Sequence, residues 1–171
     1  VADKEKDLLT KLKVELCVTA QHREMLDQIL KIFDVVPDHD LDVMKKNQDL
    51  FDVTNQILLR MRHLLSASKP RLVMVHGDTT TSMVASLASF YLNIPVAHVE
   101  AGLRTYNVRA PFPEELNRRV NGLIARIHFA PTKENYLNLI REGVNEKTVF
   151  LTGNTVIDSL KWVCSKLDLN A

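Results

Sequence analysis

The sequence has few of the residues that mark a secreted or membrane protein. It has two cysteines; Cys17 lies in an apolar run and Cys164 in a helical pattern, which favours two buried free thiols over a disulfide framework. No apolar segment reaches the roughly 18 to 20 residues that a membrane span needs, and residues 1–13 are polar rather than signal-like. The sequence therefore predicts a cytoplasmic protein that neither crosses a membrane nor enters secretion.

An excess of charge of one sign is also missing. Lysine and arginine total 22 against 21 acidic residues, and basic residues occur as pairs, at 45–46 and 118–119, rather than as tracts. A formal net charge of +1 gives no electrostatic reason to bind a polyanion, so no nucleic-acid partner is expected. With 46% hydrophobic and 25% charged residues, the 171-residue chain has the composition of one globular domain.

Short apolar runs alternate with amphipathic stretches along the chain. Buried strands, apolar on both faces, are predicted at 14–19, 72–76, 96–99, 127–130 and 149–152, with a further short extended piece at 41–44. Helices are predicted at 23–33, 50–68, 81–91, 114–125, 133–142 and 156–166. This alternation indicates an α/β fold, a Rossmann-like parallel sheet with helices on both faces.

Residues 1–171 are expected to form one N-terminal domain of a longer protein. Residues 3–12 resemble the latter part of a helix that leads into the strand at 14–19, which leaves no strand before it. A doubly wound domain normally places its first strand inside the sheet. We therefore expect the complete protein to contain an earlier strand and a second, C-terminal domain.

Polar segments follow the predicted strands, and ligands of open α/β sheets bind at the carboxyl ends of strands. These segments are residues 20–23, 77–81, 100–104, 131–132 and 153–155. All of them are expected along one edge of the sheet. The long polar loop at 104–113 is of a size that is often functional, and it could close over a ligand.

Two of these segments have both a functional and a structural interpretation. Gly77 permits a tight turn, and the threonines after it open a helix whose free N–H groups favour an anion; alternatively, Asp78 or Thr80 serves only as an N-cap. Glu100 ends a strand, where a carboxylate is placed for acid–base chemistry, but it could instead form a surface ion pair with Arg104.

Other candidates are explained structurally when they are taken singly. Glu114 and Glu115 follow Pro113, where acidic residues complement the helix dipole. His76 and His98 lie inside apolar strands and are typical of hydrogen-bonded core histidines. No cluster of His, Cys or carboxylate residues has convincing metal-ligand spacing, so no metal is predicted.

Taken together, five ordered motifs indicate a family. They read TAQHREML at 19–26, HGDTTT at 76–81, HVEAGLRT at 98–105, PFPEELNR at 111–118 and TGNTVID at 152–158. They resemble the bacterial non-hydrolysing UDP-N-acetylglucosamine (UDP-GlcNAc) 2-epimerases, and the resemblance covers nearly everything from residue 14 onward.

The resemblance implies an isomerase built as one half of a two-domain fold of the glycosyltransferase-B type. Family members are homodimers that interconvert UDP-GlcNAc and UDP-N-acetylmannosamine (UDP-ManNAc), supply ManNAc units for cell-surface polysaccharides, and use neither a metal nor nicotinamide. The reaction eliminates UDP to give 2-acetamidoglucal and then adds it back, so acid and base groups must flank C2 of the sugar.

The resemblance also assigns residues. The catalytic carboxylates would be Asp78, Glu100 and Glu114, with their roles undivided, and Arg118 would orient Glu114 or a substrate phosphate. Substrate-binding positions would be His76, Gly77, Thr79, Arg104 and Arg118. A second UDP-GlcNAc acts as an allosteric activator in bacterial members, and its pocket matches Gln21, His22, Gln48 and Glu114.

The chain departs from the family pattern because it lacks the Gly-Thr-Arg-Pro-Glu loop and the C-terminal domain, and with them half of the active site. The alternatives are a hydrolysing 2-epimerase, a related sugar-nucleotide glycosyltransferase, or a non-catalytic dimerisation fragment. The uninterrupted segments at 79–81 and 100–104 favour the non-hydrolysing enzymes.

Overall fold

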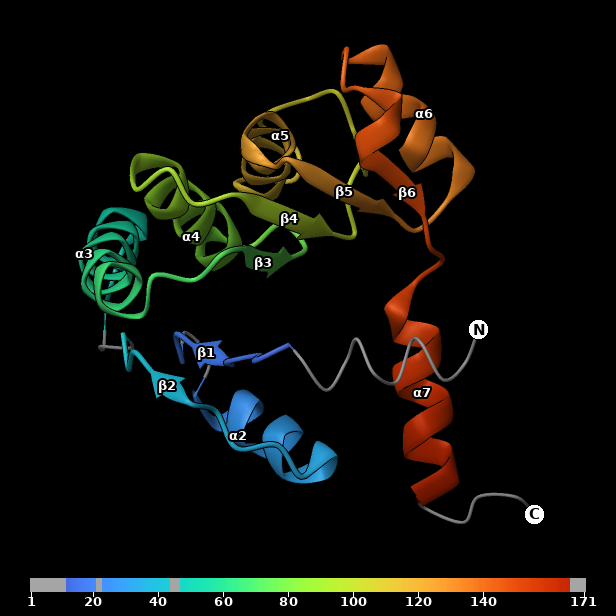
Figure 1. Ribbon diagram of the computed structural model, residues 1–171. Coiled ribbons are helices and arrows are strands. Elements are labelled where there is room, and N and C mark those ends of the chain that lie inside the picture. Colours follow the sequence, from blue (N-terminus) through green and yellow to red (C-terminus); the bar gives the residue numbers. More distant parts are fainter. Residues whose placement is uncertain (1–11, 21–22, 44–46, 167–171) are drawn as a thin grey trace. The chain divides into compact units, whose positions relative to one another are not determined.

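The computed structural model describes residues 12–20, 23–43 and 47–166, and the chain forms two compact units, Val1–Met44 and Lys45–Ala171 (Figure 1). The first unit contains β1 (Cys17–Val18), α2 (Arg23–Phe33) and β2 (His39–Asp40), and its two strands pair in parallel. The strand predicted at 14–19 is therefore only two residues long. The extended piece predicted at 41–44 is not a strand, since β2 ends at Asp40 and Asp42 has φ of +41°, although the N–H groups of Leu41 and Val43 still donate to the carbonyls of Val18 and Thr19; Met44 lies outside the described residues.

The second unit is a parallel sheet with connecting helices. Its elements are α3 (Leu50–Ser68), β3 (Val73–His76), α4 (Thr80–Tyr91), β4 (Val96–Val99), α5 (Glu114–Ile124), β5 (Ile127–Ala130), α6 (Lys133–Arg141), a 3-10 turn (Glu146–Thr148), β6 (Val149–Leu151) and α7 (Thr155–Lys166). The strand order is β3-β4-β5-β6, and every neighbouring pair is parallel (Figure 1). The predicted Rossmann-like α/β class is confirmed.

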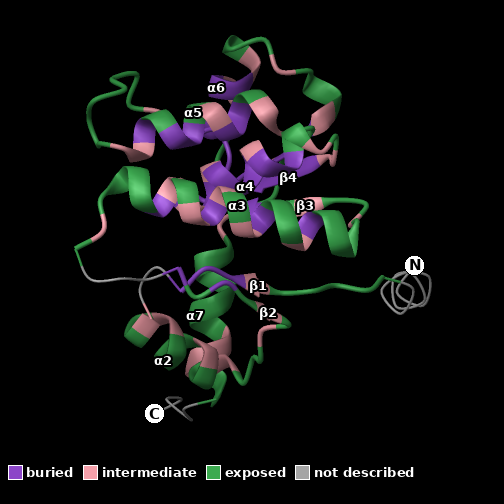
Figure 2. Ribbon diagram, turned by 90° about the vertical axis from the view of Figure 1, so that its left-hand side faces the viewer, coloured by how far each residue is buried: buried purple, intermediate pink, exposed green. Residues whose placement is uncertain are grey.

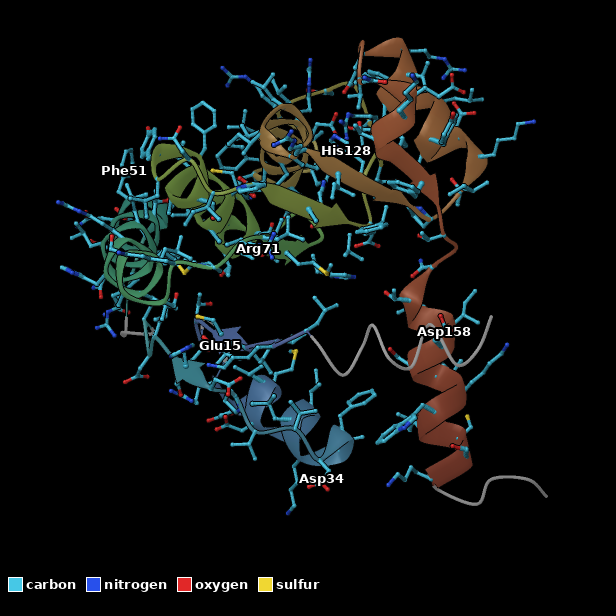
Figure 3. All side chains as sticks on the ribbon, in the orientation of Figure 1. Glu15, Asp34, Phe51, Arg71, His128 and Asp158 are labelled. Atoms are coloured by element: carbon cyan, nitrogen blue, oxygen red, sulfur yellow. The ribbon has the colours of Figure 1, made fainter. Side chains whose placement is uncertain are left out.

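Helix α3 forms because its apolar residues recur on one face. Val53, Ile57, Met61 and Leu65 are four residues apart and buried, and each contributes roughly 1.5 to 3 kcal/mol when fully buried. Phe51 is 85% exposed and belongs to the many side chains at the surface (Figure 3). None of the described helices is long and apolar enough to cross a bilayer.

Helix α4 packs against both α3 and α5, and most of it is buried (Figure 2). Its buried residues are small, which lets the neighbouring helices approach closely. The hydroxyls of Ser86 and Ser89 donate to the carbonyls of Ser82 and Ala85 at 2.9 and 2.7 Å. These polar side chains are thus satisfied inside the unit without an external partner.

The strands of the second unit differ in burial. Val96, Ala97 and His98 of β4 are buried, as predicted. Met74 of β3 and Leu151 of β6, by contrast, are 59% and 58% exposed. The prediction of burial on both faces is wrong for these two strands, which are the edges of the four-stranded sheet.

Candidate active site

The turn that follows β3 brings two strand ends together. Gly77 has φ of +70°, which favours glycine, and its N–H donates to the carbonyl of Val99 on β4 at 3.0 Å. A Cβ at Gly77 would lie 3.3 Å from Oε2 of Glu100. The Glu100 carboxylate therefore reaches across the end of β3, directly beside the residue that precedes Asp78.

Three donors hold the Gly77 carbonyl. His98 Nε2 lies 2.8 Å away, Asn121 Nδ2 3.3 Å and Ser82 Oγ 3.4 Å. Because a carbonyl only accepts, His98 must carry its proton on Nε2. Burial lowers the pKa of His98 to about 4, so the ring is neutral at physiological pH.

The two histidines predicted inside strands, His76 and His98, differ in burial. His98 is fully buried and hydrogen-bonded, as predicted, whereas His76 is exposed at the end of β3. The core-histidine interpretation is thus wrong for His76. Its exposed imidazole stays a candidate substrate-binding group at the carboxyl edge of the sheet.

Helix α5 holds Asp78 through two side chains. Arg118 Nη2 donates to Asp78 Oδ2 at 2.5 Å, and Asn117 Nδ2 donates to the Asp78 carbonyl at 2.9 Å. The Arg118 side chain is only 6% exposed and that of Asp78 is 29% exposed, so water reaches the ion pair from the Asp78 side alone. The N-cap of α4 is Thr79, whose Oγ1 accepts from the Ser82 N–H at 3.2 Å, rather than Asp78 or Thr80 as predicted.

Arg118 also binds a second carboxylate, that of Glu115. Glu115 is fully buried, and its oxygens accept from the backbone N–H groups of Thr105 and Tyr106 at 3.0 and 3.1 Å and from Arg118 Nη1 at 3.3 Å. The expectation that Arg118 orients Glu114 is therefore corrected: its carboxylate partners are Asp78 and Glu115. Sequence spacing favoured Glu114, which lies four residues before Arg118 on the helix.

Glu100 and Glu114 lie at the same edge of the sheet as Asp78. Glu100 is half-buried with φ of +66°, a conformation that is costly for a residue with a side chain and that concentrates at functional sites. Glu114 is half-buried in the first turn of α5, one turn before Arg118. The fold thus gathers all three predicted carboxylates around the β3 and β4 ends and the start of α5.

Arg104 has a different environment from the one predicted. Its Nε and Nη2 donate to the two carboxylate oxygens of Glu142 at 2.8 Å each, and Nη1 donates to the Leu103 carbonyl at 2.8 Å. The predicted pair with Glu100 does not form, because the Arg104 side chain turns inward and is fully buried. The hydrogen bonds from Arg104 lower the pKa of Glu142, so this bidentate pair is charged and fixes the loop to the end of α6.

The predicted allosteric positions are only partly described. Gln21 and His22 lie outside the described residues, and Gln48 is half-buried just before α3. Arg23, from the same motif as Gln21, binds Asp40 and Asp42 at 2.6 and 2.9 Å and thereby fastens α2 to the end of β2 within the first unit.

Sequence reasoning missed four residues that build the site: Ser82, Glu115, Asn117 and Asn121. Three of them lie on α5, whose buried residues apart from Gly122 are polar while Leu116 and Leu123 are 45% and 86% exposed, a pattern that only the structure reveals. A helix whose polar face is buried holds hydrogen-bonding groups inside the protein. That inversion marks α5 as part of a site rather than as plain core.

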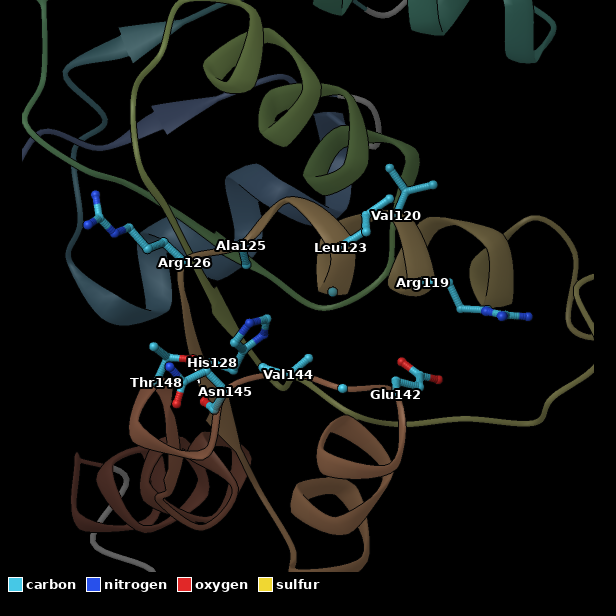
Figure 4. A pocket seen from close by; sticks show the side chains of 12 residues that line it. Arg119, Val120, Leu123, Ala125, Arg126, His128, Glu142, Val144, Asn145 and Thr148 are labelled. Atoms are coloured by element: carbon cyan, nitrogen blue, oxygen red, sulfur yellow. Dashed lines mark hydrogen bonds between the residues drawn. The ribbon is translucent and has the colours of Figure 1, made fainter.

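Two pockets lie elsewhere in this unit. One is lined by Val108, Arg109, Phe112 and Leu116, at the loop before α5. The other lies between the end of α5, the start of β5 and the segment after α6, where Arg119, Arg126, His128 and Asn145 line it (Figure 4). Neither contains the predicted catalytic carboxylates, and the described residues contain no cluster of three or more potential metal-binding side chains.

Comparison with known proteins identifies the family. A family model described as UDP-N-acetylglucosamine 2-epimerase matches residues 5–171. The chain belongs to the UDP-N-acetylglucosamine 2-epimerase family. It is 57% identical over 152 residues to the UDP-N-acetylglucosamine 2-epimerase of Campylobacter jejuni, covering 89% of this chain and 40% of the relative. It is 54% identical over 151 residues to the Escherichia coli K12 enzyme of the same name, covering 88% and 40%.

Solved structures of epimerases share the fold. The Neisseria meningitidis UDP-GlcNAc 2-epimerase, bound to UDP-GlcNAc, superposes with a TM-score of 0.90 at 49% identity, over 94% of this chain and 43% of that one. The Methanocaldococcus jannaschii enzyme, in complex with UDP-GlcNAc and UDP, gives 0.81 at 34% identity, over 86% and 41%. The predicted resemblance to UDP-GlcNAc 2-epimerases is confirmed, and so is the fold class, a Rossmann-like α/β fold whose structural relatives are enzymes of the glycosyltransferase-B type. The chain spans about two fifths of the length of these relatives.

Proposed function

We propose that this chain supplies one side of the active site of a non-hydrolysing UDP-GlcNAc 2-epimerase. The observation that carries the proposal is the Asp78–Arg118 ion pair next to Glu100, at the carboxyl ends of β3 and β4. The substrate follows from the relatives, since one solved epimerase holds UDP-GlcNAc and another holds UDP-GlcNAc and UDP.

The chemistry explains why several carboxylates are needed. The C2 proton of the sugar is barely acidic until the C1–O bond to UDP weakens and oxocarbenium character builds at C1. A base then takes the C2 proton, UDP leaves with the electrons of the C1–O bond, and 2-acetamidoglucal remains. Protonation of C2 from the opposite face and return of UDP to C1 complete the inversion.

The three carboxylates fit this reaction in different ways. Asp78 is held in one orientation by Arg118, which suits its carboxylate to stabilise a positive transition state. Glu100 and Glu114 are half-buried, and within the part of the chain that the structure describes neither forms a salt bridge with an arginine, so their carboxylates are available to exchange a proton with C2. We propose these three as catalytic residues, with His76, Gly77, Thr79 and Arg118 beside the substrate. Arg104 does not contact the substrate in this proposal; its salt bridge with Glu142 holds the loop that follows β4.

The test uses a chimaera in which residues 5–171 replace the matching segment of the Escherichia coli epimerase. Conversion of UDP-GlcNAc to UDP-ManNAc, with deuterium entering C2 from heavy water, is the expected result. Free ManNAc plus UDP would instead identify a hydrolysing enzyme. Transfer of the sugar to an acceptor with retention at C2 would identify a glycosyltransferase.

Three finer features belong to the same proposal. Activation by a second UDP-GlcNAc through Gln21, His22 and Gln48 predicts a sigmoidal dependence of the chimaera's rate on substrate. Homodimer formation predicts twice the monomer mass in light scattering. The proposed setting is the cytoplasm, where the product would serve polysaccharide synthesis.

A further inference from the structure

One fully buried carboxylate lies beside the site without being among the predicted catalytic groups. Glu115 follows Glu114 on α5, and it receives three hydrogen bonds from Thr105, Tyr106 and Arg118. Arg118 in turn donates to Asp78 through its other terminal nitrogen. The guanidinium is therefore held between a buried carboxylate and one at the edge of the sheet.

We propose that Glu115 is a positioning residue that fixes Arg118 on Asp78, a role that rests on the proposed function of this site. The Arg118 Nε is buried and has no partner within the described residues, so two carboxylates alone set the orientation of the guanidinium. Of these two, only Glu115 is fully buried and tied to the backbone. Glu115 is consequently the anchor, and Asp78 is the group that is held.

Glu115 is not itself a reacting group. Its carboxylate has no exposed surface, and both oxygens already accept hydrogen bonds from backbone N–H groups. A substrate could reach it only if the turn at Thr105 and Tyr106 opened. Catalysis through Glu115 must therefore pass through Arg118.

The same carboxylate couples the loop at 104–113 to Asp78. Tyr106 has φ of +61°, and its hydroxyl donates to Asn138 Oδ1 on α6 at 2.8 Å. Any displacement of this turn removes the N–H donors of Thr105 and Tyr106 from Glu115, and thereby loosens the carboxylate that holds one end of Arg118. The position of the loop is thus transmitted to the Asp78 carboxylate by two side chains.

The decisive variant is Glu115→Gln in the chimaera with the Escherichia coli enzyme. The amide NH₂ must face at least one of the three donors, so the network cannot close. We expect kcat to fall about 10- to 100-fold with KM changed less than about 3-fold, the scale of a small misplacement of a catalytic group. Glu134→Gln, which removes an exposed carboxylate paired with Arg141, is the matched control and should leave kcat unchanged.

A double-mutant cycle separates positioning from loss of stability. Lysine at position 118 cannot bridge two carboxylates as the arginine fork does. In an Arg118→Lys background, Glu115→Gln should therefore cost less than about 3-fold in kcat per folded enzyme. A full additive loss in that background, or near-normal turnover of Glu115→Gln alone, would overturn the proposal. If Glu115→Gln does not fold, Glu115→Asp keeps the charge, and an intermediate kcat is expected.

A measurement without turnover keeps this proposal distinct from the proposed function. In ¹⁵N-labelled 171-residue chain, the Nη–H signals of Arg118 and the amide protons of Thr105 and Tyr106 should be protected from exchange. Glu115→Gln should remove this protection and Glu134→Gln should retain it. If the unsubstituted chimaera forms no UDP-ManNAc, the proposed function fails, whereas survival of the protection in Glu115→Gln would overturn the positioning role without any turnover measurement.

Discussion

At the scale of single residues, the two strand-end carboxylates are oriented by different means. Asp78 is oriented by Arg118 and by Asn117, which binds its backbone carbonyl. Glu100 is oriented by its own backbone, with φ of +66°, and by the lack of a side chain at Gly77. Both devices reduce the reorganisation that the groups would need during a reaction.

Replacing each carboxylate by its amide tests the proposed roles one residue at a time. Asp78→Asn, Glu100→Gln and Glu114→Gln preserve shape but remove an acid–base or charge-stabilising group. In the chimaera, each should lower kcat by roughly a hundredfold or more. The rate of UDP-ManNAc formation is measured for each variant, and thermal melting followed by circular dichroism is the folding control. Near-normal turnover of one of these variants would show that the replaced residue has a structural rather than a catalytic role.

His98 makes a pH-dependent prediction. Its pKa is lowered to about 4 by burial, while the unfolded chain should titrate near the ordinary value of about 6.5. As pH falls from 6.5 to 4, the unfolded state takes up a proton that the folded state refuses, so the free energy of unfolding declines by about 3 kcal/mol over this window. Above pH 6.5 neither state is protonated at His98, and this contribution is complete.

Nuclear magnetic resonance titration of the His98 ring checks this value. The resonance should stay constant from pH 8 to pH 5 in folded chain and move near pH 6.5 in urea. His98→Gln places an amide nitrogen close to the former Nε2, so it should keep the bond to Gly77 and lose the pH dependence. A folded-state midpoint near 6.5 would contradict the burial argument.

At the scale of elements, the loop after β4 is tied to α6 by close backbone contact. Gly102 has φ of +89°, and a Cβ there would lie 2.1 Å from the Asn135 carbonyl oxygen. Gly102→Ala must therefore displace the start of α6, and we expect it to lower the free energy of unfolding by at least about 3 kcal/mol. Urea unfolding of the chain measures this change.

Gly143→Ala is the matched control for the Gly102 substitution. Gly143 has a similar φ of +84°, but an added Cβ would meet nothing within 4 Å. Only the left-handed backbone cost of roughly 1 to 2 kcal/mol is expected there. Equal losses in the two variants would show that the clash with α6 is relieved by a small shift.

Helix positions followed closely from the sequence because α3, α4 and α6 each begin at a residue whose side chain caps the helix, although α5 has no such cap. The predicted limits of α3 match the structure, with Asp49 and Asp52 forming a capping box at its start. Helices α4 to α7 differ from prediction by one residue at an end. Strands β4 and β5 match the prediction, and β3 and β6 differ from it by one residue at an end. Strand β1 is the exception: only Cys17–Val18 of the predicted 14–19 forms a strand, because pairing with β2 extends no further.

The positions of the three candidate carboxylates in the fold were predictable, but the residues that contact them were not. Motif position placed Asp78, Glu100 and Glu114 at strand ends and at a helix start, where the structure has them. Their contacts depend on residues that are distant along the chain, such as Asp78 with Arg118, 40 positions apart. Local spacing instead suggested that Arg118 pairs with Glu114 and Arg104 with Glu100. In the structure both arginines are buried and bind other carboxylates.

At the scale of the whole molecule, the chain covers about two fifths of its relatives, and the proposed reaction needs more than this part provides. Breaking the C1–O bond requires the diphosphate to be held while charge develops. The described residues near Asp78 offer one buried arginine, Arg118, which is already shared by two carboxylates. We therefore expect the diphosphate to be held largely by the part of the relatives that this chain does not cover.

We therefore predict that the 171-residue chain, purified alone, does not epimerise UDP-GlcNAc. Three carboxylates without a diphosphate clamp would face water, and the leaving group would not be stabilised as it departs. Two measurements check this: UDP-ManNAc formation, and deuterium entering C2 of the sugar from heavy water, which detects proton abstraction even without net turnover. The chimaera with the Escherichia coli enzyme is the positive control for both. Turnover by the chain alone in either assay would show that this part of the protein holds the diphosphate itself.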